Sequence, residues 1–291
     1  MLTTTSAFSK IVKASLLLIP FAVWSFVLFA QEPDDESISK LNLPASALEL
    51  GHQNSGWGAS ALFSFVEYSE PSLMTESGPL VGMGLSYTYA FRDNPVVLRL
   101  EGEYHYGQLT YNGSTSTGTP MTAPAEDNIL NGRALLGFQA QPTDRINIGP
   151  FLGVAARYLN DLIQGGYDRE ITYLYLPIGA NLTFGLSNRW LLSVGGEYDY
   201  FISGSAVSHL NQSNSEFPTV YNTQSNGYGY RLTAGLARSF EKWTLNVSPY
   251  ISCWSVQQSD IQTFSTSNGP MSAWEPENTS TMYGVKFSAR F

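Results

Sequence analysis

Two short stretches of the sequence carry the same pattern of ionisable and aromatic residues. The pattern Gly-Glu-Tyr-His-Tyr around Glu103 and His105 recurs as Gly-Glu-Tyr-Asp-Tyr around Glu197 and Asp199. Because alternate residues of a β-strand share a face, the two ionisable residues of each copy would lie side by side. A carboxylate beside a histidine, or a pair of carboxylates, can activate water. These four residues are the candidate catalytic residues of the chain.

Ten stretches of period-two alternation must position these residues. Each is long enough to cross a bilayer as a strand, which takes about 9–11 tilted residues. The two copies of the pattern lie on the third and the seventh stretch. The ten stretches are 56–68, 80–91, 96–111, 128–140, 145–158, 170–184, 190–203, 225–240, 243–256 and 280–291.

The connections between these stretches alternate strictly between short and long. The short ones are rich in turn-forming residues and lie at 92–95, 141–144, 187–189 and 241–242. The long, polar ones, read as loops, lie at 69–79, 112–127, 160–169, 204–224 and 257–279. This alternation is typical of an up-and-down barrel with periplasmic turns and outer loops. An even number of strands also leaves no sheet edge in lipid.

The last stretch alternates apolar residues with small or cationic ones and ends on an aromatic residue. Its apolar face comprises Tyr283, Val285, Phe287, Ala289 and Phe291. The pattern resembles the closing strand of bacterial outer-membrane β-barrel proteins. The resemblance implies an integral protein of the Gram-negative outer membrane, with outer-membrane lipid and the barrel-assembly machinery as partners. Tyr283, Phe287 and Phe291 would then form the assembly signal.

Aromatic residues on the predicted outer face fall at two heights, as two membrane interfaces require. Those beside the short turns are Tyr89, Phe91, Phe138, Phe184, Trp190, Phe240, Trp243 and Phe291. Those nearer the loops are Tyr104, Tyr106, Tyr158, Tyr198, Tyr200 and Tyr228. The prediction is therefore an all-β, closed antiparallel transmembrane barrel of about ten strands. Eight or twelve strands, and a water-soluble sandwich with an aromatic core, remain as alternatives.

The predicted inner face is unusually rich in charge. By alternation it carries Arg99, Glu101, Glu103, His105, Arg133, Arg157, Glu197, Asp199, Arg231, Lys286 and Arg290. In a narrow barrel, mixed charges most simply form a network of ion pairs that rigidifies the lumen and blocks permeation. The third and seventh of ten strands face each other across the lumen, so this network would include all four candidate catalytic residues.

The size and the strand count are also similar to those of the omptin outer-membrane proteases. Omptins use an Asp-Asp pair and an Asp-His pair, whereas the pairs here are Glu-His and Glu-Asp, and the sequence has no local omptin motif. The resemblance is one of architecture, and omptin-like endopeptidase activity stays an alternative to a role without catalysis.

The chain begins with features of an exported protein. Lys10 and Lys13 precede an apolar run to Ala30, after which the chain turns acidic, so residues 1–30 are predicted to be a signal peptide, with a retained helical anchor as the alternative. Residues 31–55 form a periplasmic lead-in, and residues 56–291 the barrel. Without residues 1–30, 13 basic residues stand against 24 acidic ones, which argues against a nucleic-acid partner.

Other classes of site find little support in the sequence. The single Cys253 allows no intramolecular disulfide, and the three histidines are scattered, so we expect neither a cofactor nor a metal. The loops are rich in Ser, Thr, Asn and Gly and would contact a ligand outside the cell. The leading hypothesis is a non-enzymatic outer-membrane barrel with a charge-plugged lumen and an adhesive or structural role at the cell surface. A narrow, porin-like channel for small polar solutes is the first alternative.

Overall fold

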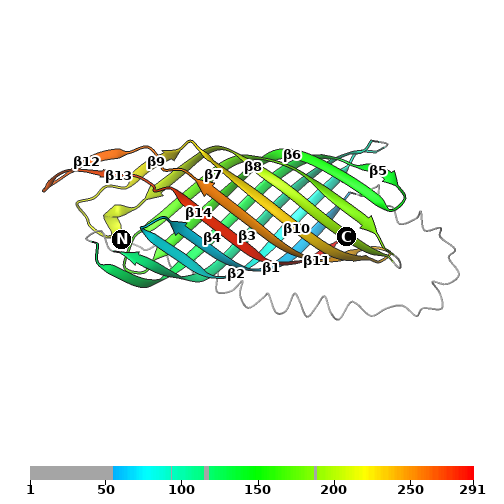
Figure 1. Cartoon of the computed structure of the whole chain (residues 1–291), viewed down its shortest axis with the longest axis horizontal. Coiled ribbons are helices and arrows are strands. Elements are labelled where there is room, and N and C mark those ends of the chain that lie inside the picture. Colours follow the sequence, from blue (N-terminus) through cyan, green and yellow to red (C-terminus); the bar gives the residue numbers. More distant parts are fainter. Residues whose placement is uncertain (1–54, 93, 115–117, 187–188) are drawn as a thin grey trace, which may run out of the picture. The chain divides into compact units, whose positions relative to one another are not determined.

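The computed structural model describes residues 55–291, apart from residues 93, 115–117 and 187–188. Within this part of the chain, ten long antiparallel strands close into a barrel (Figure 1). The strands are β1 (Gly56–Glu70), β2 (Met74–Ala90), β3 (Val96–Ser114), β4 (Pro120–Phe138), β6 (Ile146–Ile163), β7 (Asp168–Gly185), β8 (Trp190–Ser208), β10 (Gly227–Ser239), β11 (Thr244–Val256) and β14 (Asn278–Arg290).

The predicted all-β barrel of ten strands is confirmed, and the alternatives of eight strands, twelve strands and a sandwich are wrong. The predicted signal peptide and all of the lead-in except Ser55 lie outside the described residues. Among the described residues, no helix is long and apolar enough to cross a membrane.

The barrel closes where the first and last strands pair. β1 pairs with β14 from Gly58–Arg290 to Ser69–Thr279. At the end of this seam, the amide N–H groups of Trp57 and Phe291 each donate to the other's carbonyl oxygen at 2.9 Å. We call this end of the barrel, where the chain ends, the turn rim, and the opposite end the loop rim.

Among the described residues, four shorter strands lie at the two rims. β5 (Ala140–Thr143) pairs with β6 at the turn rim, whereas β9 (Val220–Gln224) pairs with the far end of β8. β12 (Gln262–Thr266) and β13 (Gly269–Ala273) form a separate hairpin. Figure 1 shows β9 and this hairpin at the end of the barrel opposite the C-terminus.

Most of the predicted long loops are in fact continuations of the strands. β3 and β4 pair as far as Ser114–Pro120, and residues 71–73 alone join β1 to β2. The reason is that the alternation of inner and outer residues continues past the outer aromatic residues, but the outer residues there are polar. There the inner residues, such as Leu109, remain buried, whereas Gln108 and Thr110 face water. The sheet therefore extends well past the outer aromatic residues.

The outer face of the barrel is apolar between the two aromatic zones. The side chains of Leu100, Leu152, Val154, Ile178 and Leu232 are 45–61% exposed. They alternate along their strands with inward residues, as the sequence predicted. A monomeric soluble protein rarely exposes an apolar surface that encircles it, so this surface matches a lipid environment.

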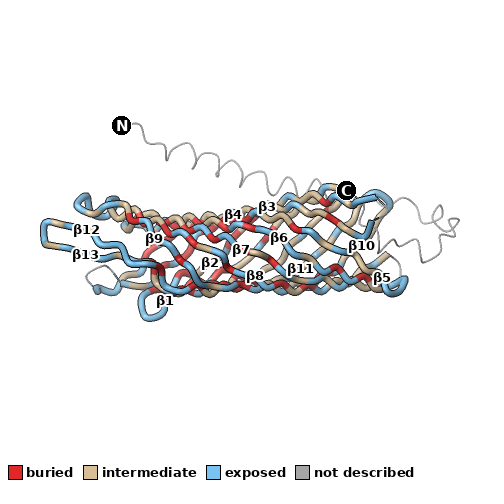
Figure 2. Tube along the Cα trace, turned by 90° about the horizontal axis from the view of Figure 1, so that it is seen from above, coloured by how far each residue is buried: buried red, intermediate tan, exposed pale blue. Residues whose placement is uncertain are grey.

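The inner face divides into two zones along the barrel axis. The half nearer the turn rim holds charged and polar side chains around a cavity. The half nearer the loop rim is filled by a buried core that includes Leu109, Ile129, Tyr175, Trp254 and Met282. Figure 2 shows the buried segments gathered towards the end that carries β9 and the hairpin.

Candidate functional site in the barrel lumen

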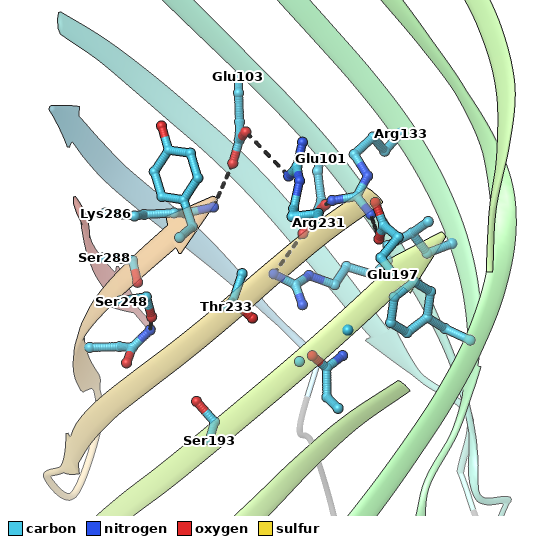
Figure 3. A pocket seen from close by; sticks show the side chains of 18 of the residues that line it. Glu101, Glu103, Arg133, Ser193, Glu197, Arg231, Thr233, Ser248, Lys286 and Ser288 are labelled. Carbon is cyan, nitrogen blue, oxygen red and sulfur yellow. Dashed lines mark hydrogen bonds and ion pairs between the residues drawn. The ribbon is translucent and has the colours of Figure 1, made fainter. Parts of the chain in front are cut away.

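A cavity of about 220 Å³ lies in the lumen on the turn-rim side (Figure 3). Charged side chains line it from β3, β4, β8, β10 and β14, together with Asn, Ser and Thr residues. The Arg99 side chain, near the turn rim, is 39% exposed. The cavity therefore lies among the predicted lumen charges and meets water at its turn-rim side.

One set of ion pairs crosses the lumen through Arg133. Arg133 and Glu101 face each other on the paired strands β3 and β4, with Nη1 of Arg133 2.9 Å from Glu101 Oε2. Arg99 adds a second contact to Glu101, at 2.6 Å. The other guanidinium nitrogen of Arg133 donates to Glu197 on β8. Since β4 and β8 are not neighbours in the sheet, Arg133 ties opposite walls together.

A second set of ion pairs converges on Glu103. Lys286 Nζ on β14 donates to Glu103 Oε1 at 2.6 Å, and Arg231 Nη1 on β10 lies 3.8 Å from Glu103 Oε2. Figure 3 shows Lys286 and Arg231 on either side of this carboxylate. Glu103 is 7% exposed, so its charge is balanced by two cations within the lumen.

The remaining predicted lumen residues also face inward, at other heights. His105 and Asp199 are 2% and 1% exposed and lie one inward position further from the turn rim than Glu103 and Glu197. Arg157 is buried on β6, within electrostatic reach of Asp127. Arg290 lies near the turn rim, within range of electrostatic repulsion by Arg99.

The structure thus brings the two copies of the pattern together through cations. Arg133 pairs with Glu197 of the β8 copy and with Glu101 next to the β3 copy. Glu103 of the β3 copy pairs with Arg231 and Lys286. Neither His105 nor Asp199 lines the cavity. The described arrangement is that of an ion-pair network within a closed lumen, and the four residues are not set in an open groove.

A layer of buried aromatic and apolar residues separates the cavity from the loop rim. Tyr173, Tyr175, Phe201 and Trp254 pack with ring centroids 4.9–5.5 Å apart. Each is no more than 5% exposed. We call these four residues, with the buried core around them, the sealing layer, because it fills the lumen between the cavity and the outer end.

Above the sealing layer, four acidic or phenolic side chains surround Arg169 of β7. Arg169 Nη2 donates to Asp161 Oδ2 at 2.9 Å and Nη1 donates to Glu275 Oε1 at 3.2 Å, while Nη1 also donates to Glu70. The guanidinium carbon lies 5.1 Å from the ring centroid of Tyr68, whose hydroxyl donates to Glu70 and Glu275. We call this group the Arg169 cluster.

Glu275 joins the Arg169 cluster from the connection between β13 and β14. It is 2% exposed. Burial raises the pKa of Glu275 from 4.5 to about 7, against the opposing charge of Arg169 and with the help of the Glu70 carboxylate. This residue therefore couples the connection after the β12–β13 hairpin to the wall of the barrel.

The sequence reasoning missed the Arg169 cluster because its residues lie in segments read as loops. Glu70, Asp161 and Glu275 fall in the stretches 69–79, 160–169 and 257–279. The signal was nevertheless present for two of them. Alternation runs on from Tyr68 to Glu70 and from Leu159 to Asp161, and extending it would have placed both acids on the inner face. Glu275 lies outside any strand and gave no such signal.

Comparison with known proteins identifies the fold of the chain but assigns it to no sequence family. No family model matches the chain, and no curated protein matches it in sequence. Among solved structures, it is similar to the outer membrane protease OmpT from Escherichia coli, with 9% identity over 81% of this chain and 97% of that one and a TM-score of 0.52. The translocator domain of the autotransporter NalP from Neisseria meningitidis matches over 87% of this chain and 95% of that one, with 8% identity and a TM-score of 0.42.

A further match is the toluene transporter TodX from Pseudomonas putida, with 11% identity over 86% of this chain and 92% of that one and a TM-score of 0.33. At 9% identity, the likeness to OmpT shows the fold alone. The chain has the fold of bacterial outer-membrane β-barrel proteins, as the closing strand predicted.

Proposed function

We propose that this protein is an integral outer-membrane barrel that does not conduct solutes and acts through its outer end, in adhesion or as a structural element. The observation that carries the proposal is the sealing layer. Tyr175 is 1% exposed and Trp254 4%, and the two rings meet in the lumen at 4.9 Å. A pore for small polar solutes needs a continuous polar path, which these residues interrupt.

The apolar outer face between the two aromatic zones, which includes Leu100 and Leu152 and which we call the apolar belt, supports the membrane location. The inner face carries the charge instead. Extracted protein should migrate faster on a gel before heating than after it, and should fractionate with the outer membrane. A product recovered in the soluble periplasmic fraction would contradict the location.

The outer end offers a surface for contacts. Tyr221 on β9 is 67% exposed, Ile261 58% and Trp274 45%, and the last two flank the β12–β13 hairpin. Exposed aromatic and apolar residues are common at binding surfaces. These residues support a role in contacting a ligand outside the cell, which the loop composition predicted.

A swelling assay with protein-loaded liposomes tests the closed lumen against the channel alternative. We expect no uptake of small sugars above that of empty liposomes, because the sealing layer blocks the lumen. A porin in the same lipids is the positive control. Swelling that depends on sugar size, as a pore would give, would favour the channel.

The ion pairs of Glu103 and Glu197 support a role without catalysis. A carboxylate held by Lys286 and Arg231, as Glu103 is, is poorly placed to activate water. We therefore expect the parent protein not to cleave a panel of basic peptides. Cleavage that is lost in Glu103→Ala and Asp199→Ala variants, which still fold, would restore the omptin-like alternative.

A further inference from the structure

Two buried carboxylates face each other directly across strands near the loop rim. Asp127 on β4 and Asp161 on β6 are Cα partners in the sheet. Both point into the lumen and are 3% and 0% exposed. Like charges placed directly opposite each other destabilise a sheet, and burial increases that cost. This pair therefore requires a compensating group.

A third carboxylate enters the same place from a strand that pairs with neither β4 nor β6. Glu76 belongs to β2, which pairs with β1 and β3, and it is 2% exposed. One carboxylate oxygen from each of Glu76, Asp127 and Asp161 lies within 4.8 Å of the other two. We call these three residues the carboxylate triad.

The triad has oxygens that no described residue satisfies. Oε1 of Glu76 and Oδ1 of both Asp127 and Asp161 are buried and accept no hydrogen bond within the described part of the chain. Most buried polar groups of native proteins are hydrogen-bonded, and an unsatisfied one is costly. Glu76 in particular is a buried side chain that reaches from another strand into the Asp127–Asp161 pair without finding a donor there.

The neighbouring cations balance only part of this charge. Arg169 donates to Oδ2 of Asp161, but the same guanidinium also serves Glu70 and Glu275. Arg157 acts on Asp127 from the cavity side. Five buried carboxylates thus lie around two guanidinium groups, so bound protons or a bound cation must balance the remaining charge of the triad.

We infer that the carboxylate triad binds a hard divalent cation, such as calcium. Three carboxylates without nitrogen or sulfur ligands are the donor set of calcium, magnesium or manganese. Two oxygens that bind one calcium at about 2.3–2.6 Å are at most about 5 Å apart. One oxygen from each of the three carboxylates lies within 4.8 Å of the others, a separation that one calcium ion can span.

A bound ion would join β2, β4 and β6 inside the outer half of the barrel. The sequence predicted no metal because the three ligands are separated by 51 and 34 residues along the chain and meet only through the barrel's register. The site is independent of the proposed lack of conduction, since it lies apart from the cavity residues.

Equilibrium dialysis with radioactive calcium tests the site on the full chain refolded in detergent, so that the ion can enter before the lumen closes. We expect one calcium per chain, and at least a tenfold weaker affinity in Asp127→Asn. The matched control is Glu126→Gln, which removes a negative charge one residue away on the outer face of the same strand. Its affinity should equal that of the parent.

Thermal unfolding gives a second readout with opposite signs. Calcium should raise the unfolding temperature of the parent at pH 8 by clearly more than that of Asp127→Asn. In EDTA the variant should unfold at a higher temperature than the parent, because the substitution relieves the repulsion. Absence of saturable binding of calcium, magnesium and manganese at millimolar concentration by the folded parent would overturn the inference, as would equal calcium binding by Asp127→Asn.

Discussion

Arg169 neutralises several of the buried carboxylates in the outer half of the barrel. It donates to Glu70, Asp161 and Glu275 and lies over the ring of Tyr68. Removing one partner of a buried ion pair leaves uncompensated charge and costs about 3–5 kcal/mol. Here three carboxylates would lose the same partner, so the cost should lie at the upper end.

We predict that Arg169→Met lowers the free energy of unfolding by about 3–5 kcal/mol, measured by guanidinium unfolding of the protein in lipid vesicles. Arg145→Met, in an exposed turn, is the control and should change it little. Equal stability of the two variants would show that Arg169 is not the centre of a buried cluster.

Glu275 predicts how stability depends on pH at the loop rim. Its neighbours are Arg169 from β7, Glu70 and Tyr68 from β1, and Asp161 from β6. Because burial raises the pKa of Glu275 from 4.5 to about 7, the folded protein holds a proton that the unfolded chain releases between these values. The contribution of Glu275 to stability is therefore constant below pH 4.5 and falls as the pH rises to 7.

We predict that Glu275→Gln removes part of the loss of stability between pH 4.5 and pH 7. The part removed is on the order of 3 kcal/mol, since each pKa unit is worth about 1.4 kcal/mol. Unfolding of the parent and the variant at a series of pH values measures the difference. Parallel curves for the two proteins would contradict the assignment.

At the scale of the strand, the cost of placing a charge at an outer position depends on the height of that position along the barrel axis. On β3, Leu100 lies in the apolar belt and Gln108 lies beyond Tyr106, and both face outward. An arginine on the lipid face costs about 2–4 kcal/mol at the membrane midplane and almost nothing beyond the interface. The same substitution at two heights of one strand therefore tests where lipid ends.

We predict that Leu100→Arg lowers the free energy of unfolding in lipid vesicles by about 2–4 kcal/mol. Gln108→Arg should change this free energy by an amount near zero. The fraction of the folded, fast-migrating form at increasing denaturant measures both. A similar penalty at Gln108 would mean that the lipid reaches higher than the outer aromatic residues.

The strands also show what the sequence could predict and what it could not. Alternation and the alternating connection lengths predicted ten strands, their order and their inner faces, because a closed sheet permits few arrangements of such a pattern. Residues such as Glu103 and Lys286 were placed on the inner face correctly. Their pairing was not predicted, because it depends on which opposite strands a side chain can reach across the lumen.

The largest errors concern the ends of the strands. Polar residues such as Gln108 and Thr110 face water on an extended sheet just as they would in a loop, so composition alone does not distinguish the two. Burial on the other face, for example at Leu109 and Asp161, is the signal that does. Reading these segments as loops ignored that signal, so neither the Arg169 cluster nor the carboxylate triad was predicted.

At the scale of the whole molecule, the barrel has two structurally distinct halves. The half nearer the turn rim carries the apolar belt outside and the ion-pair cavity inside. The half nearer the loop rim projects a water-facing sheet whose interior is sealed and whose tip bears β9 and the hairpin. Under the proposed function, the ion pairs stiffen the lumen and the outer end makes the external contacts.

Ion conductance across planar lipid bilayers tests the sealed lumen most directly. Purified, refolded protein is added to the bilayer under an applied voltage, and a porin in the same lipids provides the positive control. The account predicts no steady conductance steps from this protein, because the layer around Tyr175 and Trp254 fills the lumen. Reproducible, long-lived steps that scale with salt concentration would contradict it.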